Sequence, residues 1–124
     1  MIRANWILAG TAAFLIASAT TSFAGEADVV DVKIRAQGAT TFRIDVTAAH
    51  ADTGWDHYAD KWDVLGPDGA LLGTRVLHHP HVNEQPFTRS LTVSIPVDVD
   101  TITLRAHDSV HKYGGSEMTV MVPR

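Results

Sequence analysis

Three histidines lie within four positions of the segment RVLHHPHVNEQPF, which runs from Arg75 to Phe87. The whole chain has seven histidines and no cysteine, so imidazole is its main candidate metal donor. Neutral imidazole is the commonest metal-binding side chain and suits Zn, Cu, Fe and Ni, whereas a soft Cu(I) site prefers thiolate or thioether. Pro80 restricts its own φ and the conformation of His79, so His79 and His81 form a stiff pair that loses little entropy on chelation. The spacing therefore predicts metal binding, although histidine and proline are also common in exposed loops.

The other histidines occur in two further short segments, AHADTGWDHY and AHDSVHKYGG. Each segment follows an alternating apolar stretch, as RVLHHPHVNEQPF does. Successive connections in an up-and-down course of strands alternate between the two ends of the fold. The three histidine-containing connections are then the second, fourth and sixth, so we expect them to meet at one end, with several acidic side chains beside them. These carboxylates are Asp52, Asp56, Glu84 and Asp108.

The elements that position these segments show a hydrophobic period of two, which is typical of half-buried strands. Gly66-Pro67-Asp68-Gly69 carries proline and Asp-Gly turn chemistry and predicts a hairpin between the third and fourth strands. The expected strands are Val30 to Ala36, Phe42 to Ala48, Tyr58 to Leu65, Ala70 to Leu77, Leu91 to Ile95, Ile102 to Ala106 and Met118 to Val122.

No stretch of the chain has a convincing helical period, and a chain of this length suits one domain with one core. We therefore predict an all-β fold, a single seven-stranded antiparallel β-sandwich of the immunoglobulin or fibronectin III type, over residues 25–124.

The first 24 residues have the pattern of a signal peptide. Arg3 gives a positive start, an apolar run follows from Trp6 to Ala17, and Ser22-Phe23-Ala24 offers a small-x-small cleavage site. We expect cleavage before Gly25 and a periplasmic or secreted protein that has no membrane segment afterwards. Cleavage changes the net charge from −4 to −5, because Arg3 is the only charged side chain removed. A nucleic-acid partner is not expected, since phosphates need a basic face.

The segment FRIDVTAAHADTGWDHYADKWDVLGPDG resembles the iron-binding domain of the superoxide reductase and desulfoferrodoxin family. In that family a strand ends in a histidine-containing turn, followed by a His-Tyr pair and then a tryptophan. Here His50, His57-Tyr58 and Trp62 take these places, with intervals about one residue longer. DSVHKYGG can be laid on the family's C-terminal segment, so that His111 matches a ligand histidine and Asp108 stands where the ligand cysteine would be.

The resemblance implies iron binding by four histidines and an axial thiolate, and the chain departs from it in two ways. No histidine lies between Gly25 and Ala49, so His79 or His81 would have to complete the set. A carboxylate is a harder and weaker donor to iron than a thiolate, which puts reductase chemistry in question while leaving metal binding possible. Some members of the wider superfamily resemble the same sandwich without iron and act by binding a partner.

We therefore predict a histidine-rich divalent transition-metal site for Zn, Cu, Ni or Fe at one end of an exported β-sandwich. One alternative is a redox enzyme of superoxide reductase type. Another is a metal-free module that binds a periplasmic protein or a peptide, in which Trp55, the His-Pro-His turn and Tyr113-Gly114-Gly115 form the surface. The expected ligands are drawn from His50, His57, His79, His81 and His111, with Asp108 as a further ligand.

Overall fold

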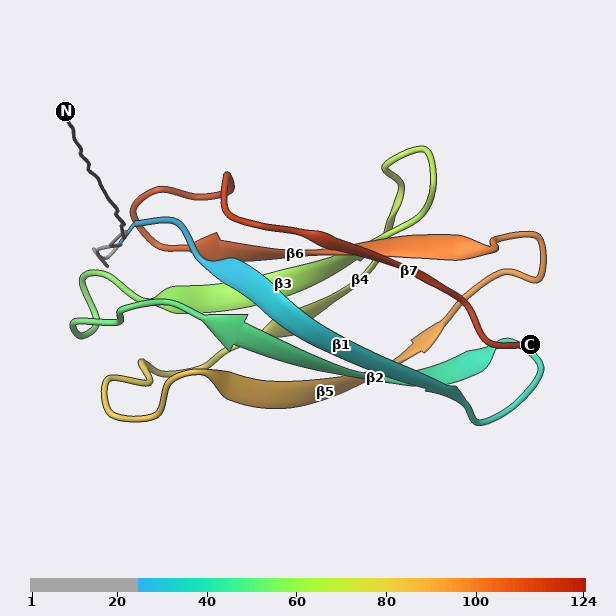
Figure 1. Cartoon of the computed structure of the whole chain (residues 1–124), viewed down its shortest axis with the longest axis horizontal. Coiled ribbons are helices and arrows are strands. Elements are labelled where there is room, and N and C mark those ends of the chain that lie inside the picture. The colour runs from blue at the N-terminus through green and yellow to red at the C-terminus, as the bar shows by residue number, and fades with distance from the viewer. Residues whose placement is uncertain (1–24) are drawn as a thin grey trace, which may run out of the picture.

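The structure is a computed structural model that describes residues 25–124, so the predicted signal peptide lies outside the described residues. It contains seven strands and no helix in this range (Figure 1). The strands are β1 (Asp28–Ala36), β2 (Thr41–Ala49), β3 (Ala59–Leu65), β4 (Leu71–Val76), β5 (Phe87–Ser94), β6 (Thr101–Asp108) and β7 (Met118–Met121). Nothing among residues 25–124 is a helix long and apolar enough to cross a membrane.

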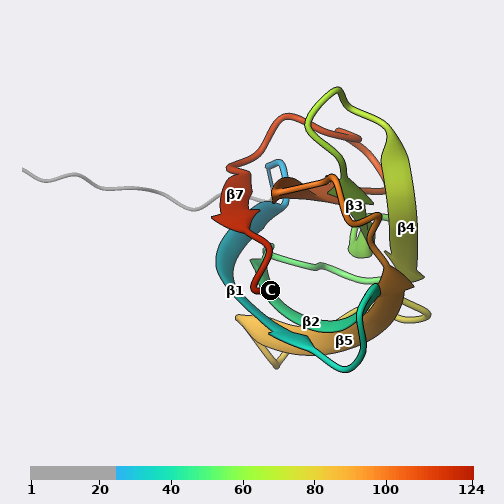
Figure 2. The ribbon, with the colours of Figure 1, turned by 90° about the vertical axis from the view of Figure 1, so that its right-hand side faces the viewer.

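The strands form two antiparallel sheets that face each other across the core. One sheet has the order β1-β2-β5 and the other the order β4-β3-β6-β7. Figure 2 looks along the strands and shows the two sheets curving towards each other, with β7 beside β1 at one edge and β4 beside β5 at the other. The prediction of seven antiparallel strands in an all-β fold is confirmed.

Alternation of apolar and polar residues places the apolar side chains between the sheets. In β2 every second residue from Phe42 to Ala48 is buried, and in β6 every second residue from Ile102 to Ala106. Trp62 of β3 is fully buried in the same core. The predicted hairpin is also present, since β3 and β4 pair from Lys61 with Val76 to Leu65 with Leu71.

The first strand differs from the prediction at its start. The expected apolar phase put Val30 inward, but Val30 is exposed and Val29 is buried instead. An irregularity in the β1–β2 pairing between Val29 and Asp31 explains the difference, because an extra residue in one strand shifts which side chains point inward. Strand β1 also begins two residues earlier than expected, at Asp28.

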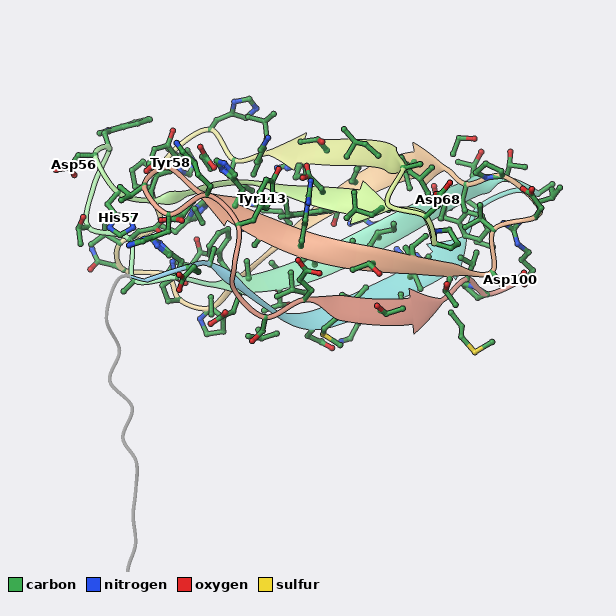
Figure 3. The ribbon with its side chains drawn as sticks, turned by 90° about the horizontal axis from the view of Figure 1, so that it is seen from above. Asp56, His57, Tyr58, Asp68, Asp100 and Tyr113 are labelled. Atoms are coloured by element: carbon green, nitrogen blue, oxygen red, sulfur yellow. The ribbon has the colours of Figure 1, made fainter. Side chains whose placement is uncertain are left out.

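Connections between successive strands alternate between the two ends of the molecule. The β2–β3, β4–β5 and β6–β7 connections, which hold or adjoin all seven histidines, lie at one end (Figure 1). In Figure 3, His57 and Tyr58 mark that end, while Asp68 and Asp100 mark the opposite one. The sequence prediction that the histidine-containing connections share one end is confirmed.

Candidate metal centre

Asp108 is the last residue of β6, and its carboxylate lies fully buried at the histidine-rich end. Its Oδ1 accepts a hydrogen bond of 3.0 Å from the backbone N–H of His111. Burial raises the pKa of Asp108, but the hydrogen bonds from the His111 backbone and from the side chains of His57 and His111 outweigh it, and the net pKa is lowered. The carboxylate is therefore anionic at neutral pH, as a metal ligand must be.

Three imidazole rings gather around the other oxygen of this carboxylate. The distances to Asp108 Oδ2 are 2.6 Å from His57 Nε2, 3.3 Å from His111 Nδ1 and 3.4 Å from His50 Nε2. The ring centroids of His50 and His57 are 4.8 Å apart, and those of His57 and His111 are 5.0 Å apart. Four residues, from the β2–β3 connection, the end of β6 and the β6–β7 connection, thus direct donor atoms to one small volume.

Short turns fix the loops that carry His57 and His111. Asp108 and Lys112 exchange two backbone hydrogen bonds, and Lys112 adopts a positive φ of 66°. The chain therefore folds back on itself, which brings the His111 ring next to the Asp108 carboxylate. The His57 loop is joined to this turn by hydrogen bonds from Ser109 N to Tyr58 O and from Tyr58 N to Ser109 Oγ.

Asp52 holds the third imidazole in place. Its Oδ1 lies 2.5 Å from Nδ1 of His50 and accepts a hydrogen bond from the backbone N–H of Ala59, while its Oδ2 accepts one from the backbone N–H of His81. Carboxylates that bind the outer nitrogen of a ligating histidine fix its tautomer and orientation. Asp52 was expected at this end from the sequence, without a role, and its position two residues after His50 was the available signal.

The other nitrogen of the His50 ring faces oxygen atoms. Nε2 lies 2.9 Å from the carbonyl oxygen of Gly25 and 3.4 Å from Asp108 Oδ2. If Asp52 keeps the ring proton on Nδ1, then Nε2 presents a lone pair to two acceptors. Either a second ring proton or a metal ion between these atoms removes that repulsion.

The donor atoms of this cluster are spaced as a metal ion requires. One ligand atom each from His50, His57 and Asp108 lies within 4.8 Å of the others. Metal bonds of about 2.0–2.2 Å to nitrogen and oxygen separate neighbouring donors by roughly 3 Å to 4 Å, so small side-chain shifts suffice. The His50 side chain is inaccessible to solvent, that of His57 is 15% exposed and that of His111 is 39% exposed. The cluster is therefore closed on the His50 side and open beside His111.

His79 and His81, which were predicted as metal ligands from the sequence, lie apart from this cluster. Their ring centroids are 4.8 Å apart, and the His81 ring stacks on Phe87 at 3.9 Å. Nε2 of His81 accepts a hydrogen bond of 2.8 Å from the Arg89 guanidinium, which occupies its lone pair. Burial, followed by the charge of Arg89, lowers the pKa of His81. His81 also contacts the cluster through its backbone N–H, which donates to Asp52.

The remaining residues considered from the sequence lie around the cluster. His107 points to the outer face of the sheet, where its Nδ1 lies 2.6 Å from Asp60 Oδ1. His78 is exposed, Trp62 is in the core and Trp55 is 67% exposed.

Comparison with known proteins gives one sequence relative and a fold likeness, and no family model matches the chain. A protein of Halomicrobium mukohataei named "Putative lipoprotein" is 43% identical over 95 residues, which are 77% of this chain. The match covers 47% of the relative, so the chain spans about half the length of that protein.

Among solved structures, the superoxide reductase (neelaredoxin) from Ignicoccus hospitalis superposes with a TM-score of 0.52 and 9% identity, covering 78% of this chain and 80% of that chain. Two variants of the same protein give TM-scores of 0.49 and 0.45. At such low identity the likeness concerns the fold alone. The chain resembles the superoxide reductase superfamily in its fold, as the sequence motifs predicted.

Proposed function

We propose that the chain binds one divalent transition-metal ion through His50, His57, His111 and Asp108. The observation that carries this proposal is the convergence of three imidazole nitrogens on a buried, anionic carboxylate oxygen. Imidazole and carboxylate together suit Zn(II), Cu(II), Ni(II) and Fe(II). His79 and His81, which were predicted as ligands from sequence, are left out of this set because Arg89 already occupies the inner imidazole of the pair.

The proposal places this site in an exported protein. Export is supported by the signal-peptide pattern of residues 1–24 and by the name of the Halomicrobium relative, a lipoprotein. The mature domain is then residues 25–124 in the periplasm or outside the cell. Its division into sheets of three and four strands supports the immunoglobulin or fibronectin III type of sandwich.

A second candidate is a redox enzyme of superoxide reductase type, which the fold likeness favours. A bound iron ion would supply the electron for such a reaction. Asp108 would hold that ion with less electron donation than a thiolate gives, while the exposed His111 side of the cluster leaves room for a small anion. With Asp108 in place of a thiolate, this candidate enzyme is expected to reduce superoxide slowly.

Calorimetric titration of tag-free protein with Zn(II), Cu(II), Ni(II) and, without oxygen, Fe(II) tests the first proposal. We expect one equivalent to bind more tightly than 10 μM, about −7 kcal/mol. Weaker binding of every ion would contradict the metal centre and favour the metal-free module, in which the exposed Trp55 contacts a protein or peptide. Superoxide consumption by the Fe(II)-loaded protein separates the enzyme from a carrier or structural site.

A further inference from the structure

The first described residue of the chain lies against the candidate centre. The carbonyl oxygen of Gly25 is 2.9 Å from His50 Nε2, which is the separation of two neighbouring donors on one metal ion with bonds of about 2.1 Å. The sequence pattern predicts cleavage between Ala24 and Gly25. The free amino group of the mature protein would then belong to the residue whose carbonyl oxygen touches the site.

The segment that follows Gly25 is fixed by burial and by hydrogen bonds, and this fixes the position of Gly25 beside His50. Ala27 is buried, the backbone N–H of Val29 donates to Ser116 O at 2.8 Å, and Ser116 N donates to Asp28 Oδ1 at 2.8 Å.

Two glycines of the β6–β7 connection allow the segment to lie this close. A Cβ on Gly115 would lie 2.0 Å from the carbonyl oxygen of Ala27, and one on Gly114 would lie 3.2 Å from Glu26 Cγ. At Gly115 only glycine permits this close approach of two backbones, whereas at Gly114 glycine is favoured by its positive φ of 130°. The same connection also carries His111. The N-terminal segment and the His111 loop are therefore packed as one unit beside Asp108.

We propose that the mature amino terminus is part of the metal centre, with the α-amino nitrogen and the carbonyl oxygen of Gly25 binding the ion as a five-membered chelate. This inference rests on the proposed metal-binding function. The chelate adds a neutral nitrogen and a neutral oxygen to the imidazoles of His50, His57 and His111 and the carboxylate of Asp108. It also lets one cation lie between Gly25 O and His50 Nε2, which are 2.9 Å apart.

Before cleavage this chelate cannot form. In the precursor the Gly25 nitrogen is a peptide nitrogen whose lone pair is delocalised into the carbonyl of Ala24, so it is a poor donor. Hydrolysis breaks the Ala24–Gly25 bond, water supplies the hydroxyl of the new Ala24 carboxyl group, and the Gly25 nitrogen gains a proton to become an amine. Tight metal loading thus follows export and processing, and the precursor binds the ion more weakly.

The test compares three tag-free chains: one that begins at Gly25, one with a single alanine added before Gly25, and one with His57→Ala that begins at Gly25. The added alanine turns the Gly25 amine into an amide and leaves every described side chain in place. We expect its affinity for Cu(II) and Zn(II) to fall at least tenfold, about 1.4 kcal/mol, while its melting temperature without metal is unchanged. Electron paramagnetic resonance of the Cu(II) forms should show one coordinated nitrogen fewer in the extended chain.

Each result bears on a different part of the proposal. Equal affinity and equal nitrogen count in the Gly25 and extended chains would overturn the role of the amino terminus. If His57→Ala then still weakens binding, the four-residue centre stands by itself. Failure of the Gly25 chain to bind any ion tighter than 10 μM would overturn the centre and this inference together. A chain with Gly25→Ala should match the parent, because alanine has the same backbone donors.

Discussion

Two histidine clusters lie at the same end of this sandwich, and they differ in the charge at their centre. His50, His57 and His111 surround the carboxylate of Asp108, whereas His81, whose ring lies next to that of His79, accepts a hydrogen bond from the guanidinium of Arg89. A carboxylate adds a donor and negative charge to the imidazoles. A guanidinium donates a hydrogen bond to the imidazole lone pair, which is then not free to bind a metal, and its positive charge repels a cation. The denser histidine segment in the sequence is therefore not the one with metal-binding geometry.

The largest expected effect is on metal affinity, and it should follow the loss of an imidazole from the Asp108 cluster but not from the His79–His81 pair. His57→Ala should weaken binding of Zn(II) at least about 100-fold, because it removes a direct donor, whereas loss of a group that only orients a ligand costs about 10-fold to 100-fold. His79→Ala, the matched control in the other cluster, should change the affinity less than about twofold. Calorimetric titration of both variants measures the contrast. Equal losses would show that both clusters hold the ion, as the sequence first indicated.

A smaller effect is expected from the carboxylate that orients His50. Asp52→Asn keeps the shape of the side chain but removes the anion that accepts from His50 Nδ1. We expect a loss of about 10-fold to 100-fold in metal affinity. Asp56→Asn is the control, since Asp56 is exposed in the same connection. An unchanged metal affinity in Asp52→Asn would show that Asp52 stabilises the loop and does not orient the His50 ring for metal binding.

The contact between His81 and Arg89 should make the free energy of unfolding depend on pH. Burial and the charge of Arg89 lower the pKa of His81 below its ordinary value of 6.5, so the unfolded chain binds this proton more readily than the folded one. The contribution of His81 to the free energy of unfolding is complete above about pH 6.5 and is lost as the pH falls towards the folded pKa. Urea unfolding of metal-free protein at several pH values between about 5 and 8 should show this loss, and His81→Leu should show less of it. The same slope in both proteins would contradict the assignment.

Arg89→Met separates the effect of the Arg89 charge on the pKa of His81 from the effect of burial. Without the guanidinium, the pKa of His81 should rise towards 6.5, because one of the two leading causes of its depression is gone. Titration of the His81 ring signal by NMR measures the change. Burial remains, so we expect an incomplete return, and a pKa that does not move would assign the whole effect to desolvation.

Much of this arrangement could be predicted from the sequence because alternation and antiparallel order are local rules. Period-two stretches indicated all seven strands, and the parity of the connections placed the histidines at one end. The partners that decide ligation could not be predicted. Arg89 meets His81 eight residues away across the β4–β5 connection, and His57 meets Asp108 across fifty-one positions of sequence. Both contacts depend on loop paths and sheet register, and the irregularity between Val29 and Asp31 was likewise not predicted from the sequence.

The smallest effect is expected at the residue adjacent to the central carboxylate. His107 precedes Asp108 on β6, and successive side chains of a strand point to opposite faces, so His107 lies on the outer face of the sheet with Asp60 and the edge of Tyr113. His107→Gln should leave metal affinity within about twofold of the parent. The His107–Asp60 pair is partly exposed, so its loss should cost at most about 1 kcal/mol of the free energy of unfolding. Titration and urea unfolding on the same preparation measure both quantities, and a tenfold loss of affinity would show that the outer face of β6 acts on the centre.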